Sequence, residues 1–199
     1  MNTSEPKVTD LVDIFNQLFA TSENTILETG AKEPFYQAAG AEQTAIIFSR
    51  DDFFSSALHE IAHWTIAGNE RRKLDDFGYW YEAEGRSEEQ QQEFELVEIK
   101  PQAIEWVLSL ACNHRFHFSA DNIAKGLEAS ETFKDCVRLQ ALDYLKSSLP
   151  KRAQLLYQEL IKHFRRGEAV RSAEVTRKSD LVRKYEVLRV PKIENKIDV

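Results

Sequence analysis

The sequence contains only two cysteines, Cys112 and Cys136, among its 199 residues. They do not form a CxxC pair, which excludes a cysteine-rich zinc finger and predicts reduced core thiols rather than a disulfide scaffold. No stretch approaches the roughly 18 uninterrupted apolar residues of a membrane-spanning helix. The first ten residues also lack the basic and apolar regions of a secretory signal. We therefore expect a soluble, cytoplasmic protein.

Positive charge is also scarce, with 26 Lys and Arg against 33 Asp and Glu and a formal net charge of −7. An acidic molecule repels the phosphate backbone, so we expect no DNA partner. Basic residues concentrate at the C-terminal end, where residues 165–199 contain ten Lys or Arg and six Asp or Glu. The chain is 42% hydrophobic, which suits one globular domain. We predict a folded domain over residues 1–165 and a basic, flexible extension over 166–199.

Hydrophobic periodicity predicts a mainly α-helical α+β fold with a small β-sheet. The predicted helices span roughly residues 8–20, 52–68, 94–111, 131–148 and 150–164. A β-branched and aromatic run over 44–48 predicts a strand, and 77–81 predicts a strand or an aromatic loop. Ser49 resembles the N-cap of the second helix and Gly68 its C-terminal αL cap. Pro101 is expected to kink or restart the third helix.

One stretch carries recognisable chemistry: "SSALHEIAHWTIAG", residues 55–68. His59 and His63 are four residues apart, so on a helix they lie on one face and are able to share a cation. Glu60 follows directly, which completes an HExxH pattern in which the histidines bind metal and the glutamate is the general acid or base. Two surface histidines without a metal are the alternative. Neighbouring apolar residues favour the metal, because half-buried imidazoles need partners.

A catalytic ion usually has three protein ligands and an open position, so a third ligand must come from elsewhere. The candidates are Asp75, Asp76, Glu82, Glu95, Glu98, His114 and His117. Glu98 stands out because it borders the apolar stripe of its helix, where a carboxylate is costly unless it is paired or binds a cation. An ion pair with Lys or Arg is the alternative for Glu98.

Two histidines and a carboxylate suit two different chemistries. With zinc they form a hydrolytic site in which Glu60 takes a proton from metal-bound water, as in a peptidase. With ferrous iron they form a 2-His-1-carboxylate triad whose open positions bind O₂ and substrate. The spacing does not distinguish these metals. A purely structural site is disfavoured, because it would normally close with four ligands.

Three segments, "SALHEIAHWTIAG", "RRKLDDFGYWY" and "VEIKPQA", together resemble the elongation factor P hydroxylase family. The resemblance covers roughly residues 9–150 and is strongest over 56–106. It implies an iron-dependent, O₂-using monooxygenase that hydroxylates the β-lysylated lysine of translation elongation factor P. It maps the family's metal ligands onto His59, His63 and Glu98. Zinc or another divalent metal is a further possible occupant, and an intracellular zinc peptidase is the alternative function.

The resemblance also implies a single zincin-like domain that carries the HExxH helix. We expect the protein to be a monomer. In this interpretation the alternatives for Glu60 are to orient metal-bound water or O₂, to shuttle a proton, or to be a remnant of hydrolytic ancestry. We expect Asp76 and Tyr79 to bind the substrate, because a long cationic side chain suits a pocket with acidic and aromatic walls. The alternative is that the aromatic residues near Tyr79 only fill the core.

Overall fold

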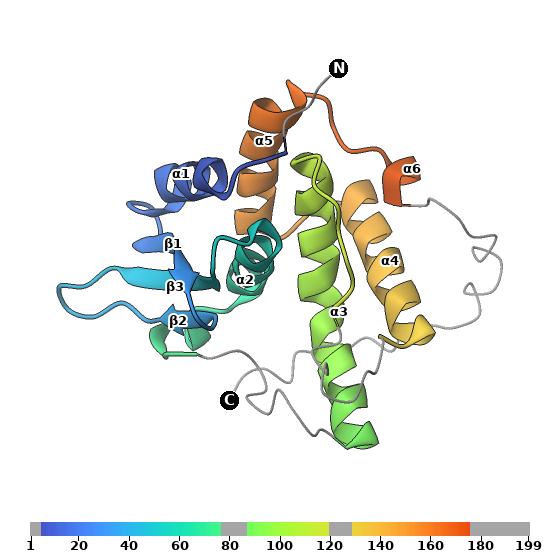
Figure 1. The fold of residues 1–199 in the computed structure, drawn as a ribbon, viewed down its shortest axis with the longest axis horizontal. Coiled ribbons are helices and arrows are strands. Elements are labelled where there is room, and N and C mark those ends of the chain that lie inside the picture. Colours follow the sequence, from blue (N-terminus) through green and yellow to red (C-terminus); the bar gives the residue numbers. More distant parts are fainter. Residues whose placement is uncertain (1–4, 77–86, 120–128, 176–199) are drawn as a thin grey trace.

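The computed structural model describes residues 5–76, 87–119 and 129–175, and it shows an α+β fold that is mainly helical (Figure 1). The helices are α1 (Val8–Phe19), α2 (Phe54–Ile66), the short 3-10 helix η1 (Arg71–Lys73), α3 (Glu88–Ala111), α4 (Glu131–Lys146), α5 (Lys151–Arg165) and α6 (Ser172–Val175). The strands are β1 (Thr25–Ala31), β2 (Phe35–Gln37) and β3 (Ala45–Arg50). The five longer helices confirm the five predicted from periodicity.

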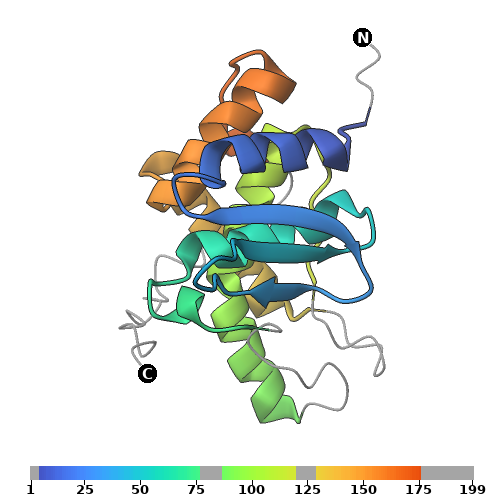
Figure 2. The same ribbon diagram turned by 90° about the vertical axis from the view of Figure 1, so that its left-hand side faces the viewer.

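The three strands form one sheet in the order β1-β3-β2, with β3 in the centre. Strand β3 is parallel to β1 and antiparallel to β2. Alternate side chains of β3, those of Ala45, Ile47 and Ser49, are buried, as expected for a strand with one face on the core. Figure 2 shows the sheet along one side of the helical body. The predicted strand corresponds to β3, whereas β1 and β2 were not predicted.

Helix α2 follows β3 closely and carries the HExxH pattern. It begins after Phe53, which has extended backbone and no side-chain cap, and it ends before Ala67, which is also extended. The predicted caps were wrong. Ser49 lies within β3 and is fully buried, and Gly68 is not among the described glycines with positive φ. The helix is therefore held by its packing rather than by caps.

That packing involves an aromatic cluster between α1 and α2. The Trp64 ring meets Phe15 and Phe19 at centroid distances of 5.1 and 4.9 Å, both with edge-on geometry. All three side chains are nearly or fully buried, and such aromatic pairs add to the stabilisation that burial provides. The apolar face of α1 thus fixes the position of the helix that carries the two histidines.

Helix α3 packs beside α2 and is the longest helix in the described part, with 24 residues. It starts with a capping box, in which Ser87 accepts from the amide of Gln90 and the Gln90 side chain accepts from the amide of Ser87. Pro101 lies inside the helix. The proline does not restart the helix, although it cannot donate a hydrogen bond to the preceding turn.

The chain after α5 packs on the body as far as residue 175. Val170 and Val175 are buried, and Arg165 forms an ion pair with Glu174. Residues 176–199 lie outside the described residues, so a flexible extension remains a prediction there. Cys112 and Cys136 are both free. Among the helices of the described ranges, none combines the length and apolar character that crossing a membrane requires.

Candidate metal centre

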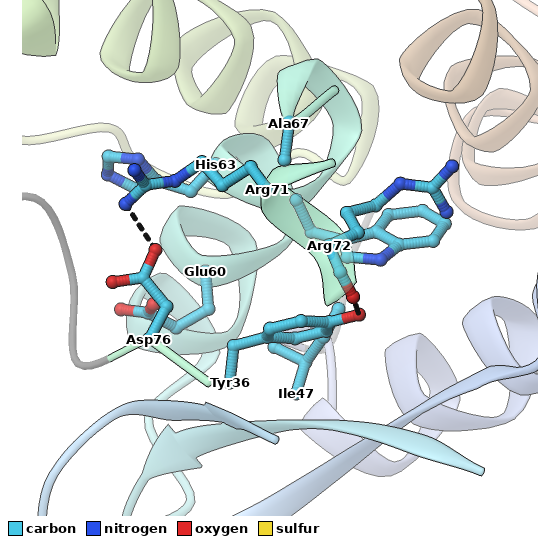
Figure 3. Close-up of a pocket in the computed structure, with 9 residues that line it drawn as sticks. Tyr36, Ile47, Glu60, His63, Ala67, Arg71, Arg72 and Asp76 are labelled. Carbon is cyan, nitrogen blue, oxygen red and sulfur yellow. Dashed lines mark hydrogen bonds and ion pairs between the residues drawn. The ribbon is translucent and has the colours of Figure 1, made fainter. Parts of the chain in front are cut away.

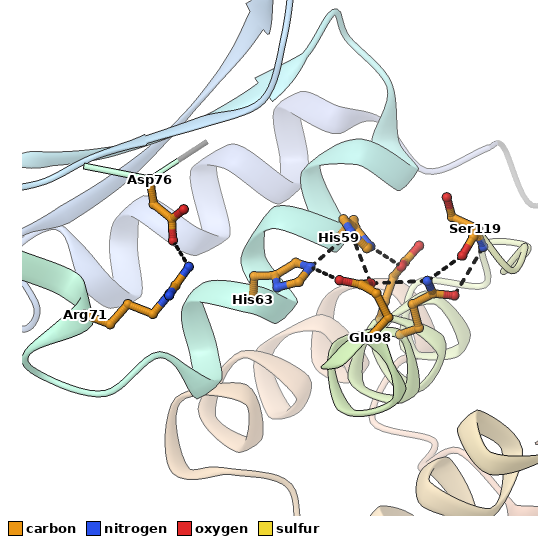
Figure 4. A network of polar contacts seen from close by, with 8 residues as sticks. His59, His63, Arg71, Asp76, Glu98 and Ser119 are labelled. Carbon is orange, nitrogen blue, oxygen red and sulfur yellow. Dashed lines mark hydrogen bonds and ion pairs between the residues drawn. The ribbon is translucent and has the colours of Figure 1, made fainter. Parts of the chain in front are cut away.

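Two neighbouring helices bring three of the predicted site residues together. Nε2 of His63 lies 3.1 Å from Nε2 of His59 and 3.1 Å from Oε1 of Glu98. Nε2 of His59 lies 3.7 Å from Oε2 of Glu98. Figure 4 shows both rings directed from α2 toward the carboxylate on α3. The two helices therefore converge on one point that is shared by two imidazoles and one carboxylate.

This arrangement fits a single transition-metal ion. One ligand atom from each of the three residues lies within 4.8 Å of the others. An ion bonded to nitrogen and oxygen at about 2.1 Å would hold its neighbouring ligand atoms about 3 to 3.5 Å apart. Imidazole and carboxylate suit zinc and iron alike, so this donor set does not identify the metal.

Glu98 is deeply buried, with only 2% of its surface exposed. Burial alone would raise the pKa of its carboxyl group, but the nearby His63, followed by His59 and a hydrogen bond from Gln102, lowers that pKa to about 2. The side chain is therefore an anion at neutral pH. The alternative raised from the sequence, an ion pair with Lys or Arg, is not what the structure shows.

Two further residues of α3 contact the cluster, and both were missed in the sequence. Oε2 of Glu105 lies 2.8 Å from Nδ1 of His59, on the side of the ring opposite to Nε2. Nε2 of Gln102 donates to Oε2 of Glu98 at 3.2 Å. A signal did exist, because positions four and seven residues beyond Glu98 lie on the same helix face. The identity of their partners, however, depends on how α2 packs against α3.

The contact with Glu105 changes the electrostatics of His59. Burial alone would lower the pKa of the imidazole, but its hydrogen bond and charge interaction with Glu105, with smaller effects of Glu98 and Glu60, place that pKa well above its usual value. Burial raises the pKa of the Glu105 carboxyl group, while the interaction with His59 opposes that shift. Each of the two side chains therefore favours the charged form of the other.

A pocket opens beside the cluster, between α2, the sheet and the segment after η1 (Figure 3). It encloses about 490 Å³, including some open solvent, and it is lined by Tyr36, Ile47, Glu60, His63, Trp64, Ala67, Arg71, Arg72 and Asp76. In Figure 3 the carboxylates of Glu60 and Asp76 lie at the same end of the pocket as His63 and Arg71. The pocket thus combines two carboxylates, two guanidinium groups and aromatic walls with access to one side chain of the cluster.

The other candidate ligands that the structure describes lie outside the cluster. Asp75 accepts from the backbone amide of Ala38, and Asp76 forms an ion pair with Arg71. Glu95 accepts from the amide and hydroxyl of Ser130 at the start of α4, and the His114 ring packs on Phe54. His117 is exposed on the segment after α3. Tyr79 and Glu82 lie outside the described residues.

Comparison with known proteins agrees with these features. The sequence model of the family described as elongation factor P hydroxylase matches residues 14–174. A curated protein of Haemophilus influenzae, named elongation factor P lysine hydroxylase, is 51% identical over 159 residues, which cover 79% of this chain and 89% of that protein. The range matched by the family model includes both helices of the cluster. The chain belongs to the elongation factor P hydroxylase family.

Proposed function

We propose that this chain is an iron-dependent monooxygenase that hydroxylates the β-lysylated lysine of translation elongation factor P with O₂. The observation that carries this proposal is the 51% identity to a protein named elongation factor P lysine hydroxylase, over 89% of that protein's length. The cluster of His59, His63 and Glu98 supports it, because it offers the donor set of a 2-His-1-carboxylate site.

In this proposal His59, His63 and Glu98 would hold ferrous iron. Bound iron(II) supplies the one-electron chemistry that activates O₂, which no amino-acid side chain provides. Three protein ligands leave coordination positions open for O₂ and substrate. Glu98, an anion at neutral pH, brings negative charge to a site that is partly closed to water. The apolar core beside α2 and α3 restricts solvent access from the other side.

The pocket beside His63 is the proposed binding site of the modified lysine. Its aromatic walls, Tyr36 and Trp64, suit the aliphatic part of a long side chain, and Asp76 with Glu60 suits its ammonium groups. Asp76 already contacts Arg71, so a substrate ammonium group would have to share or replace that partner. Tyr79, which follows Asp76 closely in the sequence, remains a proposed substrate residue outside the described residues.

Glu60 is proposed to hold and move a proton at the end of the pocket beside His63. It lies next to His59 on α2 and lines the pocket with His63. Its position suits a general acid or base, but it is not one of the three clustered ligands. We further propose kinship with the zincin fold, on the basis of an HExxH helix packed against a small sheet. We also propose that the enzyme acts as a cytoplasmic monomer.

Mass spectrometry of elongation factor P tests the proposed reaction. Protein purified without oxygen and loaded with Fe²⁺ is mixed with β-lysylated elongation factor P, an electron donor and O₂. We expect the modified lysine to gain the mass of one oxygen atom, and ¹⁸O₂ to supply that oxygen. Elongation factor P with an unmodified lysine is the matched control substrate. A lysine that gains no oxygen under these conditions would contradict the proposal.

The pocket position of Glu60 also keeps a zinc peptidase as a second candidate, because the same glutamate would take a proton from zinc-bound water. Zinc-loaded and iron-loaded protein are therefore compared on elongation factor P under identical conditions. We expect only the iron form to change the substrate, and only by oxygen addition. Cleaved peptide from the zinc form would favour the peptidase.

A further inference from the structure

Helix α3 carries an unusual buried polar face beside the proposed metal site. Glu98, Gln102 and Glu105 are 2%, 0% and 5% exposed, and their neighbours Ala103 and Ile104 are fully buried. Burying three such side chains is costly unless each has a partner. Glu98 belongs to the cluster itself, so the other two residues raise the question of what they do there.

Glu105 contacts the ring nitrogen of His59 that faces away from the cluster. The distance from Oε2 to Nδ1 is 2.8 Å, and the His59 ring presents Nε2 to His63 and Glu98. A carboxylate only accepts hydrogen bonds, so Nδ1 must carry the proton in that contact. A metal ion replaces the proton of the other nitrogen, and in the resulting neutral imidazole the lone pair of Nε2 is directed to the ion.

We propose that Glu105 is a positioning residue of the metal centre, which holds His59 in the orientation and tautomer that bind the ion. The inference rests on the proposed function only in requiring that a divalent ion binds the cluster. Glu105 lies seven residues after Glu98, so the same helix face supplies one ligand and orients another. A single movement of α3 would therefore displace both contacts together.

The charges of the site support the same assignment. A divalent ion brings two positive charges into a largely buried position, and neutral imidazoles do not compensate them. The carboxylates of Glu98 and Glu105 together supply two negative charges, so the loaded site is neutral when both are ionised. Compensation of this kind stabilises a buried ion. Glu105 thus contributes its charge as well as its hydrogen bond.

Gln102 performs a comparable task for Glu98. Its side-chain amide donates to Ser119 O at 2.8 Å, and its Oε1 accepts from the Ser119 amide at 3.2 Å. These two backbone contacts fix which end of the amide faces Glu98, and that end donates to Oε2 at 3.2 Å. The ligand carboxylate, like the ligand imidazole, is thus oriented by a side chain of α3.

Titration with Co²⁺, whose absorption bands report its coordination, tests the role of Glu105. Glu105→Gln keeps an acceptor for Nδ1 but removes the charge, whereas Glu105→Ala removes both. We expect the Ala variant to bind Co²⁺ most weakly and the Gln variant to have an affinity between those of Ala and wild type. The affinity of the Ala variant should be about 10- to 100-fold below that of the wild type. The absorption spectrum of the Ala variant should also change, because the His59 ring is no longer held.

The matched control is Asp135→Asn, which removes another buried carboxylate, paired with Arg138 on α4. This variant should bind Co²⁺ like the wild type, with an unchanged spectrum. If Glu105→Ala does not fold, the Co²⁺ affinity of the isosteric Gln variant tests the role of Glu105. Wild-type affinity and an unchanged spectrum in the folded Glu105 variants would overturn the assignment.

Hydroxylation by the wild-type enzyme is measured separately, so the two proposals fail independently. Weaker Co²⁺ binding in the Glu105 variants without any hydroxylation by the wild type would remove the proposed reaction and keep the positioning role. Hydroxylation by the wild type, together with normal Co²⁺ binding in the Glu105 variants, would keep the proposed reaction and remove the positioning role.

Discussion

Oε1 of Glu98 lies 3.1 Å from Nε2 of His63, although the two residues belong to different helices. This contact closes the only cluster of three or more potential metal-ligating side chains found among residues 5–76, 87–119 and 129–175. Because α3 supplies the carboxylate and α2 both imidazoles, metal binding and the packing of these helices depend on each other.

Glu98→Ala should therefore abolish metal binding, because two imidazoles alone hold a divalent ion weakly. We expect iron affinity to fall by more than about 100-fold, since even residues outside the ligand set change affinity by 10- to 100-fold. Metal analysis after anaerobic loading measures this loss. Glu95→Ala on the same helix is the control, as Glu95 contacts Ser130 instead. Full iron content in the Glu98 variant would disprove the ligand assignment.

Gln102→Ala should lower both stability and metal affinity. It removes two hydrogen bonds to the half-buried Ser119 backbone and one to Glu98, which costs about 1 to 3 kcal/mol in the free energy of unfolding. Urea denaturation and Co²⁺ titration measure the two effects. Gln154→Ala is the control, because Gln154 accepts one hydrogen bond from Leu149 far from the cluster. It should leave Co²⁺ affinity unchanged, and equal losses of affinity in both variants would contradict the role of Gln102.

Glu60→Gln separates the two candidate chemistries. If Glu60 only moves a proton during hydroxylation, the variant should keep its iron and lose about 10²- to 10⁴-fold in rate, as expected for a general acid or base. A zinc peptidase would lose its peptide cleavage instead. The comparison combines metal content with rates on elongation factor P. Loss of iron from this variant would instead place Glu60 among the ligands.

The sequence predicted the helices better than the sheet. Long apolar periodicities in α1, α3 and α5 are visible without any knowledge of their partners. Strand β1 was missed because its outer half contains Glu28 and Gly30 and is largely solvent-accessible, so it lacks a clear alternation. Strand β2 has only three residues, all half-buried. Both strands depend on pairing with β3, which local sequence does not reveal.

The candidate site shows the same division between local and tertiary information. His59 and His63 follow from a spacing of four, and Glu98 was chosen because a carboxylate beside an apolar stripe needs a partner. Glu105 was missed, because a buried glutamate on the third helix acquires its role only when His59 is placed beside it. The caps predicted for α2 were wrong, because Ser49 belongs to β3 and the backbone is already extended at Ala67, before Gly68.

The Arg165 and Glu174 pair should give stability that depends on pH. Burial would raise the pKa of Glu174, but hydrogen bonds from Arg165 and Arg171 lower it. A lowered pKa in the folded state means that the stabilisation is complete above the unfolded pKa of about 4.3 and is lost as pH falls through the folded value. The free energy of unfolding of the wild type should exceed that of Glu174→Gln by about 1 to 2 kcal/mol at neutral pH.

Urea denaturation at a series of pH values measures this difference, which should shrink below pH about 4.3. Glu159→Gln removes a more exposed ion pair with Lys162 and serves as the control. It should have little effect at any pH, because surface pairs contribute little. A gap between wild type and Glu174→Gln that stays constant across the acid range would contradict the assignment.

Arg152 connects the end of α2 to α5. Its guanidinium donates to the carbonyl oxygens of Trp64 and Ala67 at 3.1 and 2.5 Å and lies 4.9 Å from the centre of the Trp64 ring. These carbonyls belong to the C-terminal end of α2, directly after His63, so that end cannot fray without breaking contacts to a different helix. Its amides should exchange with deuterated solvent at rates close to those of global unfolding. The backbone beside His63 should then open only when the whole domain unfolds.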